Sequence, residues 1–138
     1  YPEMDLTVLH PENRINDLYG REYEFGVQDC FEALRDYLDV ENIKIPPRVM
    51  FQEDYWNKNI DYFNEKTIKN WNHSPVDLQE IQKNDVLIFK IYSDINNHCG
   101  VYLGNDIFYH HAEERLSCRE NLYPRWHKWL VGAYRYDA

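Results

Sequence analysis

The stretch that decides the fold runs Gly26-Val27-Gln28-Asp29-Cys30-Phe31-Glu32-Ala33-Leu34-Arg35-Asp36-Tyr37-Leu38. Asp29 is a residue type that often caps the start of a helix, and Glu32, three residues later, can complete a capping box. Apolar residues then recur at helical spacing, at Phe31, Leu34 and Leu38. The stretch therefore predicts a helix that begins at Cys30, ends near Val40 and packs its apolar face on the core.

Cys30 falls on the first turn of this predicted helix. Unpaired backbone N–H groups and the positive end of the helix dipole favour a thiolate there, which lowers the pKa of a cysteine from its free value of about 8.5. Cys30 is therefore a candidate nucleophile. The alternative is a small, buried hydrophobic residue with no chemical role.

The size and charge of the chain exclude several classes of protein. A length of 138 residues suits one domain, over residues 1–138. Lys and Arg number 15 against 24 Asp and Glu, a net charge of −9, so nucleic acid is not an expected partner. The apolar run Val86–Phe89 is far short of the roughly 20 residues of a membrane span, so no membrane insertion is expected. Residues 1–5 lack the features of a secretory signal.

Three cysteines, Cys30, Cys99 and Cys118, form an odd set without a Cys-x-x-Cys pair. This pattern indicates neither a disulfide framework nor a zinc ribbon. At least one thiol must be unpaired within the chain.

Helical patterns come first along the chain and strand patterns follow. A short helix is expected over residues 13–19. A second amphipathic segment follows the possible cap Asp54, with Trp56, Ile60 and Phe63 at helical spacing, and residues 70–75 have a loop composition. Segments typical of strands cover residues 85–91, 97–103, 107–112 and 129–136. The order predicts an α+β domain whose N-terminal helices pack on a C-terminal antiparallel sheet.

The segments 97–103 and 107–112 are expected to form a β-hairpin. If Gly104-Asn105-Asp106 is a three-residue loop, Gly100 pairs with His110, and His98 lies diagonally beside His110 on one face. A loop of even length would select His111 instead. Gly100, lacking a side chain, is expected to leave open space on that face.

These residues suit acyl transfer from an amide. Cys30 would attack the carbonyl, His98 would exchange protons, and His110 would orient His98. The backbone N–H of Cys30 is the expected oxyanion donor, with Tyr23 and Asp29 supporting the oxyanion and substrate. Asp29 suits a helix cap better than an acid catalyst, and packing explains Tyr23 equally well.

A metal site is the other chemical interpretation. His98, His110, His111 and a cysteine have donor types that bind zinc. Strand parity argues against this set, because Cys99 and His111 should face away from His98.

Taken together, the motifs resemble the NlpC-type cysteine peptidases of bacterial cell walls. The motifs are residues 20–31 around Cys30, 84–89, 97–104 around His98, and 108–110. Residues 29–37 and 110–117 resemble more narrowly the branch found in tail-tip proteins of long-tailed bacteriophages. The resemblance covers about residues 15 to 135.

The resemblance implies a papain-like α+β fold and a Cys-His-His triad at Cys30, His98 and His110, with no cofactor or metal. It also implies cleavage of peptidoglycan stem peptides during infection, by a virion tail-tip protein that contacts other tail-tip or hub proteins and acts in the host cell envelope. The chain departs from the family pattern at two places that bear on the shape of the substrate groove. Phe31-Glu32 stands where cell-wall members commonly have Ser-Gly after the cysteine, and Val27 replaces the second glycine before it. The competing hypothesis is a non-catalytic structural plug of the tail tip.

Overall fold

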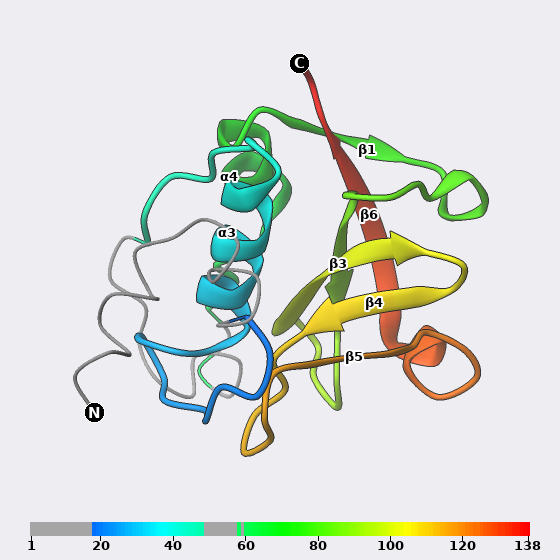
Figure 1. Cartoon of the computed structure of the whole chain (residues 1–138). Coiled ribbons are helices and arrows are strands. Elements are labelled where there is room, and N and C mark those ends of the chain that lie inside the picture. The colour runs from blue at the N-terminus through cyan, green and yellow to red at the C-terminus, as the bar shows by residue number, and fades with distance from the viewer. Residues whose placement is uncertain (1–17, 49–57, 59) are drawn as a thin grey trace.

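The protein is an α+β structure in which helices cover one side of an antiparallel sheet (Figure 1). The computed structural model describes residues 18–48, 58 and 60–138. Its helices are α3 (Cys30–Val40) and α4 (Glu65–Asn70), with 3-10 helices η2 (Leu78–Glu80) and η3 (Trp126–Trp129). The strands are β1 (His73–Val76), β2 (Val86–Phe89), β3 (His98–Gly104), β4 (Ile107–His110), β5 (Cys118–Asn121) and β6 (Leu130–Tyr136). Their order in the sheet is β1-β6-β2-β3-β4-β5.

Helix α3 has the bounds that the sequence predicted. Oδ1 of Asp29 accepts a hydrogen bond from the backbone N–H of Glu32 at 3.0 Å, which caps the first turn. The predicted apolar stripe is buried, at Phe31, Leu34 and Leu38. The Glu32 carboxylate does not close a capping box but instead accepts from Arg35 at 2.9 Å and from Arg48 at 3.1 Å.

The two faces of the sheet bury different clusters. One face packs on α3, where the helix stripe meets Val86, Ile88, Cys99 and Val101. The opposite face carries Leu87, Phe89, Phe108, Leu122, Trp126 and Ala133. Successive side chains of β2 and β3 thus point to opposite faces of the sheet, as in any pleated strand.

The hairpin register is the one predicted. Strands β3 and β4 pair Gly100 with His110 and Tyr102 with Phe108. The connecting turn is shorter than expected, because Gly104 pairs with Ile107, but the register shifts by one residue after Tyr102 and the parity is unchanged. The turn residues Asn105 and Asp106 have φ of 53° and 61°, which Asn and Asp tolerate well.

The expectation of open space beside Gly100 was wrong. A Cβ at Gly100 would lie 2.9 Å from the carbonyl oxygen of Tyr109 and 3.2 Å from Cβ of His110. The side chains of Phe108 and His110 fill that face, so Gly100 permits close packing within the hairpin.

Several other elements differ from the sequence expectations. Strand β1 lies in the segment expected to be a loop, and β5 was not predicted. Both are short and rich in polar residues, and the ladders with β6 and β4 create them. Residues 60–64 form a turn before α4, with Asn64 as its N-cap, so the helical spacing of Ile60 and Phe63 was misleading. The expected helix at 13–19 and the segment around Asp54 and Trp56 fall largely outside the described residues. Among the described residues, no helix has the length and apolar character to span a membrane.

We expect Leu34→Ala to lower the free energy of unfolding by about 2–5 kcal/mol, because it leaves a cavity between α3 and the sheet. Leu116→Ala makes the same chemical change at a side chain that is 55% exposed and should change stability by less than about 0.5 kcal/mol. Urea denaturation of both variants measures this difference. Equal stabilities would contradict the role of α3 packing.

Candidate active site

Cys30 begins α3 and faces a cavity of about 400 Å³. Its side chain is 8% exposed, and the cavity wall beside it includes Tyr23, His98 and Trp126. The helix start and strand β3 meet here, because α3 packs on β3 and β4 and its buried stripe shares an apolar cluster with Cys99 and Val101 of β3. The packing therefore brings Cys30 and His98 together at a solvent-accessible cavity.

Several groups lower the pKa of Cys30 to about 6. The hydrogen bond from Cys99 has the largest effect, burial opposes it, and a hydrogen bond and positive charge from His98 lower the pKa further. The negative charge of Asp29 opposes them and raises the pKa. Thiolate is thus favoured near neutral pH, as expected for a cysteine at a helix start beside an imidazole.

Cys99 is a neighbour of Cys30 that the sequence analysis did not assign to the site. It is fully buried on the α3 face of the sheet, opposite the face that carries Phe89 and Phe108. Burial and the adjacent Cys30 raise the pKa of Cys99 well above its usual value, so it stays a thiol and can donate to the Cys30 sulfur. The sequence signal that could have found Cys99 is its position directly after His98. Cys30, at the start of α3, contacts both residues.

His98 and His110 form a hydrogen-bonded pair. Nε2 of His98 lies 2.8 Å from Nδ1 of His110, and both rings are almost fully buried. Because Nε2 is used in this bond, Nδ1 is the nitrogen of His98 left for Cys30. Trp126 of η3 packs on both rings, stacked on His98 at a centroid distance of 6.0 Å and edge-on to His110 at 4.6 Å. Burial is the main cause that lowers the pKa of each histidine.

Glu120 on β5 extends this chain of contacts. Its Oε2 lies 2.7 Å from Nε2 of His110, and its Oε1 accepts from Arg115 at 2.8 Å. The hydrogen bond with His110 is the main cause that lowers the pKa of Glu120 to about 2. The sequence analysis missed Glu120, because β5 has no hydrophobic alternation that would have predicted its pairing with β4.

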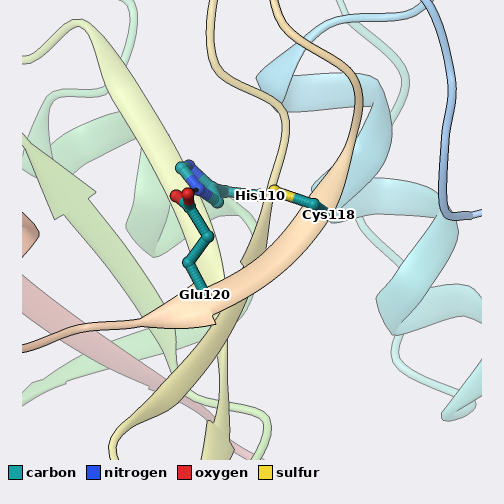
Figure 2. Close-up of side chains that lie close together, drawn as sticks. All are labelled: His110, Cys118 and Glu120. Atoms are coloured by element: carbon teal, nitrogen blue, oxygen red, sulfur yellow. Dashed lines mark hydrogen bonds and ion pairs between the residues drawn. The ribbon is translucent and has the colours of Figure 1, made fainter.

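His110, Cys118 and Glu120 also form the one group of three metal-type donors found among the described residues (Figure 2). Their donor atoms lie within 4.8 Å of one another. Both ring nitrogens of His110 are already hydrogen-bonded, to His98 and Glu120. We therefore assign His110 and Glu120 to a hydrogen-bonded chain, which does not include Cys118. The set considered from the sequence, three histidines and a cysteine, is not assembled in the described part of the chain.

His111, the other candidate for the third residue, points elsewhere. Its Nε2 contacts the carbonyl oxygen of Arg115 at 2.8 Å, and its ring lies edge-on to Tyr23 at 5.2 Å. It lines the cavity, but its hydrogen bond goes to Arg115, while the Nε2 bond of His98 goes to His110. The hairpin register thus places His110, and not His111, against His98.

Tyr23 lies at the cavity beside Cys30. Burial is the main cause that raises the pKa of Tyr23, and the neighbouring Cys30 and Asp29 raise it further. Tyr23 therefore keeps its hydroxyl proton at any ordinary pH. It can donate a hydrogen bond into the cavity.

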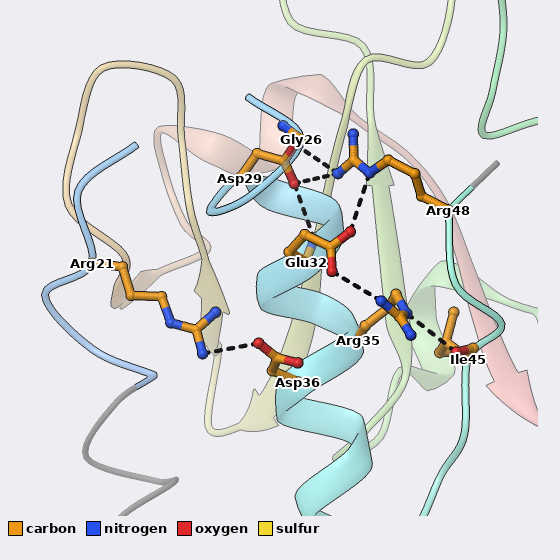
Figure 3. A network of polar contacts seen from close by, with 8 residues as sticks. All are labelled: Arg21, Gly26, Asp29, Glu32, Arg35, Asp36, Ile45 and Arg48. Atoms are coloured by element: carbon orange, nitrogen blue, oxygen red, sulfur yellow. Dashed lines mark hydrogen bonds and ion pairs between the residues drawn. The ribbon is translucent and has the colours of Figure 1, made fainter. Parts of the chain in front are cut away.

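Asp29 is held inside the protein. Arg48 donates to both carboxylate oxygens of Asp29 at 2.6 Å, and the backbone N–H of Gly26 donates to Oδ2 at 2.8 Å (Figure 3). Asp29 is 2% exposed. Because both oxygens are bonded within the chain, Asp29 supports the site by fixing the loop and helix start that carry Cys30.

We expect Cys30 to be the cysteine most reactive with iodoacetamide, with a rate that rises through a midpoint near pH 6 as the thiolate forms. Cys99 and Cys118 should react slowly at neutral pH, because burial raises the pKa of each. Peptide mass spectrometry after timed labelling measures all three rates. Faster labelling of Cys118 would contradict this ordering.

Replacement of Cys99 should show how much its hydrogen bond, apart from His98, lowers the pKa of Cys30. Cys99→Ala removes the donor and should raise the alkylation midpoint of Cys30 by about one to two pH units, since a hydrogen bond to a charged group is worth about 1.5–3 kcal/mol. Cys99→Ser keeps a donor of similar size and should stay closer to the unmodified protein. An unchanged midpoint in the alanine variant would remove Cys99 from the site.

Comparison with known proteins confirms the family that the sequence motifs resemble. The sequence pattern of the NlpC/P60 family matches residues 20–135. The chain is 29% identical over 130 residues to tail tip assembly protein K of Escherichia phage lambda, with 94% of this chain and 64% of that protein covered. The chain thus spans just under two thirds of the length of this relative.

Solved structures share the fold at low sequence identity. An NLP/P60 family protein similar to a lipoprotein, from Staphylococcus aureus, has a TM-score of 0.62 at 21% identity, covering 95% of this chain and 41% of that one. The peptidoglycan hydrolase RipB of Mycobacterium tuberculosis has a TM-score of 0.56 at 15% identity, covering 95% of this chain and 65% of that one. The family match over most of the chain and the shared fold together establish that this chain belongs to the NlpC/P60 family.

Proposed function

We propose that this protein is a cysteine endopeptidase of a phage tail tip that hydrolyses peptide bonds of bacterial peptidoglycan during infection. The observation that carries the proposal is the connected set Cys30, His98 and His110 at an open cavity, with the Cys30 pKa lowered to about 6. Members of this family are commonly cysteine peptidases or peptidoglycan hydrolases.

The proposed reaction has two stages. The Cys30 thiolate attacks the carbonyl carbon, and the His98 imidazolium gives its proton to the leaving amine, which leaves an acyl-enzyme thioester. Water then attacks the thioester while His98 accepts its proton, and the thiolate leaves as the acid product forms. His110 Nδ1, 2.8 Å from Nε2 of His98, keeps the His98 ring oriented throughout.

The negative charge on the carbonyl oxygen needs donors during both stages. The backbone N–H of Cys30 is one, because the first N–H groups of a helix have no partner within it. The hydroxyl of Tyr23 is the second, since the raised pKa keeps it protonated beside Cys30. Asp29 contributes by holding the helix start in place through Arg48.

Cationic and aromatic groups in the cavity suit the stem peptides of peptidoglycan. Arg125 lies over the ring of Trp126 at 5.3 Å, and both line the cavity. Stem peptides carry free carboxylates, which an arginine can bind through two hydrogen bonds. This local positive group contrasts with the net charge of −9 of the chain.

The relation to a tail tip assembly protein supports a place in the virion tail, with other tail-tip or hub proteins as partners. The same relation favours a second candidate function, a non-catalytic structural component of the tail tip. Family membership alone does not separate the two, because a structural component would keep the fold.

Turnover of peptidoglycan fragments distinguishes the two functions. We expect the unmodified protein to release soluble peptides, and Cys30→Ala to lose at least about a thousandfold in rate because the nucleophile is gone. Cys118→Ala, at the partly exposed cysteine of β5, is the matched control and should retain activity. Chromatography and mass spectrometry of the products measure the release. Equal release by the protein and its Cys30→Ala variant would disprove the peptidase.

A further inference from the structure

We propose that Glu120 is a positioning residue of this site, which holds His110 in the one tautomer that His98 can use. The inference deepens the proposed function and rests on it in one respect, that His98 carries the proton exchanged with Cys30. A chain of hydrogen bonds runs from His98 through His110 to Glu120.

The protonation state of His98 sets the requirement. When Cys30 is a thiolate and His98 an imidazolium, both ring nitrogens of His98 carry protons and act as donors. The Nε2–H of His98 then points at Nδ1 of His110, 2.8 Å away. Nδ1 of His110 can accept this bond only if it carries no proton. His110 must therefore be neutral, with its single proton on Nε2.

Glu120 selects that tautomer. An ionised carboxylate can only accept hydrogen bonds, so Oε2 of Glu120, 2.7 Å from Nε2 of His110, requires a proton on Nε2. The other tautomer would place a lone pair of His110 against the carboxylate and an N–H against the N–H of His98. Both contacts would be repulsive, in a region where His110 is 1% exposed.

The burial of His110 favours a neutral ring. Burial is the main cause that lowers the pKa of His110; Glu120 opposes this effect, and Arg115 and His111 add to it. Cys118 is the cross-strand partner of His110 and remains a thiol. Arg115 holds the second oxygen of Glu120 at 2.8 Å, which orients the carboxylate toward His110.

The negative charge of Glu120 also reaches His98 through the His110 ring. It stabilises the His98 imidazolium and, with it, the Cys30 thiolate. Glu120 does not face the cavity, whose wall is formed by His98, Cys30 and other residues. It therefore acts through His110 and not on the substrate.

The test measures the pH dependence of Cys30 alkylation by iodoacetamide in Glu120→Gln and Glu120→Ala. Glutamine has nearly the same shape and can still accept from Nε2–H, but it carries no charge, so it should preserve the fold. Glu114→Gln is the matched control, because Glu114 is an exposed carboxylate in the connection that leads from β4 into β5. Peptide mass spectrometry reports Cys30 separately from the other cysteines.

We expect the Cys30 midpoint to rise by about one pH unit in Glu120→Ala, which makes alkylation about tenfold slower below the midpoint. Glu120→Gln should shift it by less, and Glu114→Gln should leave it unchanged. Nitrogen-15 NMR of the His110 ring should show the Nε2–H tautomer in the unmodified protein and a mixture in Glu120→Ala. Unshifted midpoints in both Glu120 variants, or a proton on Nδ1 of His110 in the unmodified protein, would overturn the inference.

Alkylation and ring NMR need no peptide substrate, so the two proposals fail separately. A protein that cleaves no peptidoglycan fragment but shows the Glu120 shifts would lose the proposed peptidase activity and keep the Glu120 role. Normal peptide release with unshifted Cys30 midpoints would keep the proposed peptidase activity and remove the role of Glu120.

Discussion

The packing of α3 on strands β3 and β4 is the constraint on which the rest of the structure depends. The buried stripe Phe31, Leu34 and Leu38 is what the helix contributes to this contact, and removal of its apolar surface from water stabilises the contact. The same contact brings Cys30 at the helix start to His98 at the start of β3. A shift of the helix by one turn, about 5.4 Å, would separate sulfur from imidazole and end their proton exchange.

Buried polar groups are costly unless they are hydrogen-bonded, and the rings of His98 and His110 meet this requirement by belonging to one chain of hydrogen bonds. His98 bonds His110, His110 bonds Glu120, and Glu120 bonds Arg115. Asp29 is likewise bonded to Arg48 and Gly26 at the helix start (Figure 3). The ionised Glu120 lies at the partly exposed end of the chain, where water lowers its desolvation cost. The deeply buried rings can then remain neutral until Cys30 gives up its proton.

Strand register supplies the second constraint. The β3–β4 ladder pairs Gly100 with His110, and the β4–β5 ladder pairs His110 with Cys118, so Glu120 falls two residues along on the same face. The absence of a side chain at Gly100 lets Phe108 and His110 pack closely there. A slip of one residue in either ladder would turn His110 or Glu120 to the opposite face.

The sequence by itself determined the elements with strong local signals, namely the capped helix at Cys30 and most of the central strands. The choice between His110 and His111 depended on the length of the β3–β4 turn, and the structure made it through a register shift after Tyr102. Periodicity and capping are local, so they can be read from neighbouring residues. Only the tertiary structure decided the contacts of Cys99, Trp126, Arg48 and Glu120 with the site. Strand β5 is polar and pairs through its backbone, and Arg48 reaches Asp29 across the fold, so neither leaves a periodic pattern. Their positions follow from which surfaces pack together, a property of the folded chain and not of any short stretch of it.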